Sequence, residues 1–153
     1  MTILASLLFE HFEPSDDNSF LTVPISLISE NRSAAAVHDK VTAKENHESW
    51  VSSQFSGWDG RHKVLSNIIK DNLNDSGSFK HISTDYIDVS DKEMQAVVNE
   101  TLANAGFKAR VTVGDLFIIE KFSAKNAFNA TIKSTAYGIA RESDNTVTLL
   151  GIM

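Results

Sequence analysis

The chain has 153 residues, of which 42% are hydrophobic and 22% are charged. This size and balance are typical of one soluble globular domain and exclude collagen-like, disordered and membrane-spanning classes. Because there is no cysteine, disulfides, thiolate nucleophiles and cysteine-ligated zinc are excluded as well. We expect a single domain over residues 1–153, in the cytoplasm or in a virion, with no cofactor and no metal.

The formal net charge of −6 is unevenly distributed. Residues 1–31 contain five acids and no base, and residues 71–100 contain seven acids and two bases, whereas residues 101–153 contain six bases and four acids. An acidic body disfavours nonspecific nucleic-acid binding, which needs several cations on one face. It can attract a basic partner, so a soluble acidic inhibitor or immunity protein is one alternative function.

The N-terminal half is predicted to be mainly helical. Residues 2–12 have helical spacing of apolar side chains and end at Pro14. The acids that follow this segment do not fit a signal-peptide cleavage site, so we expect no targeting signal. Residues 20–28 are apolar and β-prone, but Pro24 restricts any strand there to an edge or a broken strand, and a helix is the other alternative for this segment.

Two further helices are expected before the first strand. Ser33 can cap a helix that reaches Trp50 or Val51, and its thin apolar stripe predicts an exposed or partner-covered helix. Residues 54–60 form a turn, and residues 64–73 then have a clean apolar stripe that ends before Gly77.

The C-terminal half is predicted to be mostly β. Residues 80–89 alternate loosely and form a short strand, and Ser90 and Glu93 form a capping box for a helix that ends at Gly106. Residues 108–113, 116–122, 131–141 and 146–152 read as strands, the first two joined by a tight turn. The expected fold is α+β: an N-terminal helical half and a C-terminal four-stranded antiparallel meander packed against one or two helices.

The histidines are the first candidates for chemistry. His11 lies between Glu10 and Glu13, which could hold a divalent ion but read more simply as solvated charge. His47-x-Ser49 and His81-x-Ser83 resemble the double His-x-Ser/Thr signature of two-histidine phosphoesterases. That resemblance would imply a small hydrolase using His47, His62 or His81, a second alternative function. The first pair falls on a predicted helix, however, so we assign no catalytic residue.

Two segments point to binding. Residues 58–63 combine Trp58 and Arg61 with Asp59 and a histidine; the simplest interpretation is a helix start capped by Asp59 with Trp58 tucked against the following turn. If the loop is functional, Trp58 and Arg61 would anchor a partner. Residues 108–133 interleave Arg110, Lys121, Lys125 and Lys133 with aromatics that include Phe107, Phe117, Phe122 and Phe128, and on a sheet these could stack single-stranded bases. Strand alternation places many of these aromatics inside, so nucleic-acid binding is not expected.

The apolar ends of the sequence suggest contact with a neighbour. We therefore expect a non-enzymatic protein that works through a protein partner or self-association, without membrane contact, most concretely as a structural or assembly subunit of a bacteriophage particle. The predicted contact residues are Leu4, Leu7, Leu8, Phe12, Trp58, Arg61, Leu149 and Leu150.

Overall fold

The computed structural model describes residues 25–153, and side-chain positions from residue 36 onward. The chain forms two compact units, residues 1–39 and residues 40–153, and the sheet lies entirely in the second. The predicted N-terminal helix at residues 2–12 lies outside the described residues. Within the described part of the chain, no helix has the length and apolar character needed to cross a membrane.

Helix α1 (Ile25–Gln54) is longer than the sequence predicted. The sequence left strand and helix open for residues 20–28, and the structure shows that residues 25–28 are helical. Pro24 directly precedes the helix, and proline is favoured at a helix start, so the same residue that argued against a strand was a helix signal. Residues 36–46 are all exposed, which confirms the expectation of an exposed helix.

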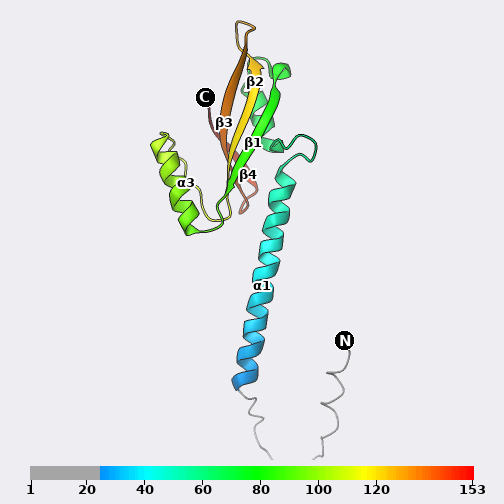
Figure 1. The fold of residues 1–153 in the computed structure, drawn as a ribbon, viewed down its shortest axis with the longest axis vertical. Coiled ribbons are helices and arrows are strands. Elements are labelled where there is room, and N and C mark those ends of the chain that lie inside the picture. Colours follow the sequence, from blue (N-terminus) through cyan, green and yellow to red (C-terminus); the bar gives the residue numbers. More distant parts are fainter. Residues whose placement is uncertain (1–24) are drawn as a thin grey trace, which may run out of the picture. The chain divides into compact units, whose positions relative to one another are not determined.

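The sheet contains β1 (Lys80–Asp88), β2 (Leu116–Lys125), β3 (Thr131–Arg141) and β4 (Thr146–Ile152). All neighbours pair antiparallel in the order β1-β2-β3-β4 (Figure 1). With the helices mainly N-terminal and the strands mainly C-terminal, the predicted α+β class is confirmed.

The predicted strand over residues 108–113 is wrong, and β1 takes its place beside β2. Side chains of helix α3 (Lys92–Asn104), not a neighbouring strand, form the hydrogen bonds to the backbone of Val111. Its amide donates to Asn99 Oδ1 at 2.8 Å, and its carbonyl accepts from Asn99 Nδ2 at 3.1 Å and from Gln95 Nε2 at 3.0 Å. The alternating pattern of this segment therefore reflects one-sided packing against α3.

The two faces of the sheet carry separate cores. In the first core, Leu116, Ile118 and Phe122 of β2 pack with residues of α1 and of α2 (Lys63–Asp71). In the second core, Phe117 and Ile139 pack with residues of α3 (Lys92–Asn104) and with the segments that flank it. Strand β2 is thus buried on both sides and supplies residues to each core.

The helix caps differ in detail from those predicted. Asp91, not Ser90, caps α3, because its Oδ1 accepts from the Met94 amide at 2.8 Å. Gly106 has φ +82°, as expected for a residue that ends a helix. A short 3₁₀ helix, η1 (Ser76–Ser78), follows α2 and leads into β1.

Gly138 on β3 marks the closest packing of the first core against the sheet. A Cβ at this position would lie 2.8 Å from Leu65 Cδ1 and 2.9 Å from Cδ2, and Leu65 is fully buried. We expect Gly138→Ala to lower the free energy of unfolding by about 1–3 kcal/mol through overpacking. Urea denaturation measures this.

Gly57→Ala is the matched control, since nothing lies within 4 Å of a Cβ there. Its unfolding midpoint should stay close to that of the wild type. Equal midpoints for the two variants would show that Leu65 has room to move away from the sheet.

Candidate functional site

His47 bridges the end of α1 to the sheet. Its Nδ1 lies 2.7 Å from Glu142 Oε2, and its Nε2 lies 3.1 Å from both carboxylate oxygens of Asp88. Partial burial lowers the pKa of His47, but the hydrogen bonds from its ring to Glu142 and Asp88 outweigh this and raise the pKa above 6.5. The protonated ring donates from both nitrogens, so the bridge is an ion pair that fastens α1 to the ends of β1 and β3.

A shallow hollow beside this bridge is lined by residues of α1, β1 and the segment before β2. Both nitrogens of His47 face carboxylates, which leaves no lone pair for a metal. Among the described residues, no group of histidines and acids has an arrangement that could hold a metal ion. The cluster therefore reads as a structural bridge.

A second polar cluster lies inside the first core. His62, Ser66 and Glu120 are all fully buried. His62 Nδ1 accepts from the Leu65 amide at 3.1 Å and caps α2, and the Ser66 hydroxyl donates to Glu120 Oε1 at 2.5 Å. Burial lowers the pKa of His62 to about 4 and raises the pKa of Glu120, the latter opposed by the Ser66 hydrogen bond. With no access from solvent, this cluster connects α2 to β2 and offers no surface to a substrate.

The histidines named for the hydrolase alternative are dispersed. His47 meets β1 at Asp88, whereas His81, bonded to Thr84 Oγ1 at 2.8 Å, lies near the other end of the strand. Seven strand residues span about 23 Å, so the two His-x-Ser pairs do not face each other. His62 is buried, and His11 lies outside the described residues.

The loop around Trp58 differs from its simplest interpretation. His62 rather than Asp59 caps the following helix, and the Trp58 side chain is not tucked against a turn but is 96% exposed. Arg61 lies in the same loop, with its Nε 3.7 Å from Asp59 Oδ2. The structure therefore leaves Trp58 available to a partner, which was the functional alternative for this segment.

The other predicted contact residues are less accessible or are not described. Leu149 packs against the first core and Leu150 against the second, both partly buried. The N-terminal leucines Leu4, Leu7 and Leu8, and Phe12, lie outside the described residues.

Some of the acids expected to form the surface of an inhibitor make hydrogen bonds within the chain. Asp88 is bonded to His47 and Asp91 caps α3, whereas Asp85 is exposed. Two of the acids in this region thus have structural roles, and no specific observation favours an inhibitor.

Comparison with known proteins gives no relative: no family model, no curated protein and no solved structure matches the chain. Function must therefore be argued from the residues themselves.

The His47 bridge predicts a pH-dependent stability. Because its folded-state pKa lies above 6.5, its stabilisation is fully present below pH 6.5 and is lost as pH rises through the folded-state value. His47→Gln should flatten this part of the stability profile and cost about 1 kcal/mol at pH 6, since the pair is partly solvated. Urea denaturation from pH 5.5 to 8.5 measures it.

His81→Gln is the control, because His81 is bonded to a threonine hydroxyl rather than to a carboxylate. An unchanged pH slope in His47→Gln would show that the bridge does not contribute to folding.

The buried Ser66–Glu120 hydrogen bond gives a second prediction. Ser66→Ala leaves the buried carboxyl without its side-chain donor and should cost about 1–3 kcal/mol. Glu120→Gln keeps an acceptor for Ser66 and removes the buried charge, so it should match or exceed wild-type stability at pH 7.

The carboxyl of Glu120 stabilises the folded state most below its ordinary pKa of 4.5. This stabilisation is lost as pH rises through the raised folded-state pKa of Glu120. The advantage of Glu120→Gln should therefore grow with pH over that range. His62 titrates in both proteins, so their difference isolates Glu120. Wild-type stability in Ser66→Ala would show that the hydrogen bond contributes nothing.

Proposed function

We propose that the chain is a non-enzymatic subunit that associates with further copies of itself through the Trp58 loop (residues 56–61). The observation that carries the proposal is the 96% exposure of Trp58 on an ordered loop. Tryptophan and arginine dominate binding hot spots, and this loop presents both.

The Trp58 loop is held by its own backbone. The Ser56 amide donates to the Arg61 carbonyl at 2.9 Å, and the Gly60 amide donates to the Ser56 carbonyl at 3.0 Å. Gly60 has φ +69°, a conformation that other residues rarely adopt. A loop closed in this way loses little conformational entropy on binding.

The base of the Trp58 loop is anchored in the first core. Phe55 and His62 form a β-bridge across it, and their rings meet edge to face at 5.4 Å. Phe55 also contacts Tyr86 of β1, with ring centroids 4.8 Å apart. Trp58 is therefore displayed from a rigid support, as a binding anchor requires.

Burial of the Trp58 side chain would contribute a large part of the free energy of association. Burying roughly 150–250 Å² of aromatic surface yields about 4–6 kcal/mol before the costs of association. The exposed part of α1 offers further surface, since Val41 is 49% exposed there. A subunit of a bacteriophage particle is the concrete version of this proposal, and its support is compositional: an acidic chain without cysteine.

Trp58→Ala should weaken self-association strongly without affecting the fold. A side chain this exposed contributes little to folding, so the free energy of unfolding should change by less than about 0.5 kcal/mol. Loss of a hot spot weakens association by roughly 2 kcal/mol or more, about thirtyfold. The measurement is absolute mass by light scattering behind a sizing column, at low and at high salt and at several concentrations.

Phe128→Ala is the matched control, because Phe128 is also a loop aromatic and is 90% exposed. It should keep the wild-type mass. A wild-type monomer at every concentration would overturn self-association, and an oligomer unchanged by Trp58→Ala would remove the Trp58 loop from the interface.

A further inference from the structure

The burial of β2 changes halfway along the strand. Its first three residues are fully buried and Ile119 is partly buried, so both faces are covered there. From Glu120 onward burial alternates: Phe122 and Ala124 stay buried in the first core, whereas Lys121 and Lys125 are exposed. The cover on the α3 side therefore ends after Ile119, and the rest of that sheet face is open.

Four lysines lie on this open part of the sheet. Directly opposite residues of antiparallel strands share a face, and Ser123 is paired with Lys80 on one side and Lys133 on the other. Lys121 and Lys125 flank Ser123 on the same face of β2. With strands about 4.8 Å apart and about 3.3 Å per residue, the four Cα atoms fall within roughly 10 by 13 Å. We call Lys80, Lys121, Lys125 and Lys133 the lysine face.

The lysine face carries more positive than negative charge: Asp85, paired with Ile119, lies on the same side of the sheet, and Asp75 lines an adjoining hollow. Among the described residues, none of the four lysines forms an ion pair. Two hollows adjoin them: one includes Ser123 and Thr131, the other Thr135 and Met153. Lysine ammonium groups and hydroxyls both donate hydrogen bonds to phosphate oxygens, so this surface can bind phosphates.

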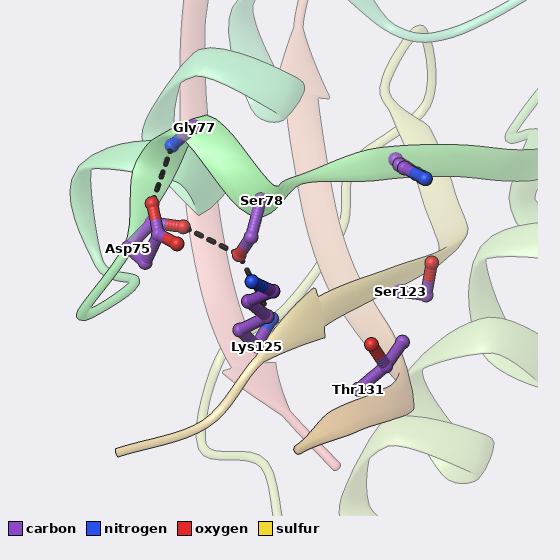
Figure 2. A pocket seen from close by; sticks show the side chains of 7 residues that line it. Asp75, Gly77, Ser78, Ser123, Lys125 and Thr131 are labelled. Atoms are coloured by element: carbon purple, nitrogen blue, oxygen red, sulfur yellow. Dashed lines mark hydrogen bonds between the residues drawn. The ribbon is translucent and has the colours of Figure 1, made fainter. Parts of the chain in front are cut away.

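The first hollow has a fixed wall, shown in Figure 2. The Ser78 hydroxyl donates to the Asp75 carbonyl at 2.7 Å and accepts from the Lys125 amide at 2.8 Å, which ties η1 to the end of β2. The one carboxylate in this lining belongs to Asp75, whose Oδ1 accepts from the Gly77 amide at 3.1 Å. The wall is thus preformed, and its only acid is already engaged.

An exposed aromatic follows the lysine face along the chain. Phe128, 90% exposed, lies in the β2–β3 turn three residues after Lys125. Asn126 Oδ1 accepts from the amides of Phe128 and Ala130, both at 3.0 Å, so the turn is ordered. An exposed ring in the turn that follows Lys125 can stack an unpaired base while the lysines neutralise the phosphates.

We propose that the lysine face and Phe128 bind single-stranded nucleic acid through its phosphates and one stacked base. An open sheet face suits a single strand with splayed bases better than a duplex, whose bases are read in grooves. The net charge of −6 does not prevent this, because four lysines outnumber the two nearby acids, Asp75 and Asp85, and repulsion from the more distant acids is screened beyond about 8 Å at physiological salt. This inference reverses the expectation from composition, and it does not depend on self-association.

The test is fluorescence anisotropy with a labelled 20-nucleotide oligothymidine, titrated at several salt concentrations. Neutralising four phosphates of a single strand predicts a slope of log affinity against log salt near −3, from about −0.7 per contact. Lys121→Glu/Lys133→Glu should weaken binding at least tenfold and flatten the slope. Phe128→Ala should weaken binding about tenfold with the slope unchanged, because stacking is not ionic.

The matched control is Lys92→Glu/Lys108→Glu, which changes net charge equally at two exposed lysines outside the lysine face. It should keep most of the affinity. Thermal unfolding confirms that each variant is folded. Three results would each overturn the proposal. They are equal losses of affinity in both double variants, no binding by the wild type at the lowest salt, and equal competition by polyglutamate at matched charge.

Discussion

Strand β2 supplies buried side chains to two cores, one on each face of the sheet, and this constraint determines where the other elements lie. Over Leu116–Phe117–Ile118 the strand is apolar on both faces, which requires a covering layer on each side of the sheet. Helices α1 and α2 cover one face, and α3 with its flanking segments covers the other. Because α3 is short, its layer stops after Ile119, and the strand changes there from continuous to alternating burial.

Glu120 occupies the position where that change occurs, and it faces the side that remains covered. A buried carboxyl requires a donor, which Ser66 of α2 supplies. The same turn of α2 begins at buried His62, whose ring packs against Phe55 at the base of the Trp58 loop. The polar groups of the first core therefore fix α2 on the sheet and, through His62, the support from which Trp58 is displayed.

Local patterns predicted the elements that are stabilised locally. The helical stripe of residues 64–73 and the hairpin of residues 131–152 were found, because period and turn residues determine them. The strand at residues 108–113 was wrong, because its hydrogen bonds go to Asn99 and Gln95, which no alternation reveals. The exposure of Trp58 was not expected either, because the sequence suggested Asp59 as the cap of α2, whereas the cap is His62. The sequence did indicate Lys121, Lys125 and Lys133 of the lysine face, but not Lys80, which joins Lys121 only through the register of β1 with β2.

The two proposed surfaces can be occupied together. The Trp58 loop is anchored beside Tyr86, which is paired with Ile118 and so faces the first core. The lysine face lies on the opposite side of the sheet, and Lys80 is six residues from Tyr86 along β1, about 20 Å in an extended strand. A polyanion bound on one side would therefore not obstruct a neighbouring subunit on the other. Copies joined through Trp58 would instead each present a lysine face to the same strand, so assembly would raise the effective concentration of lysine faces and tighten binding without any new contact.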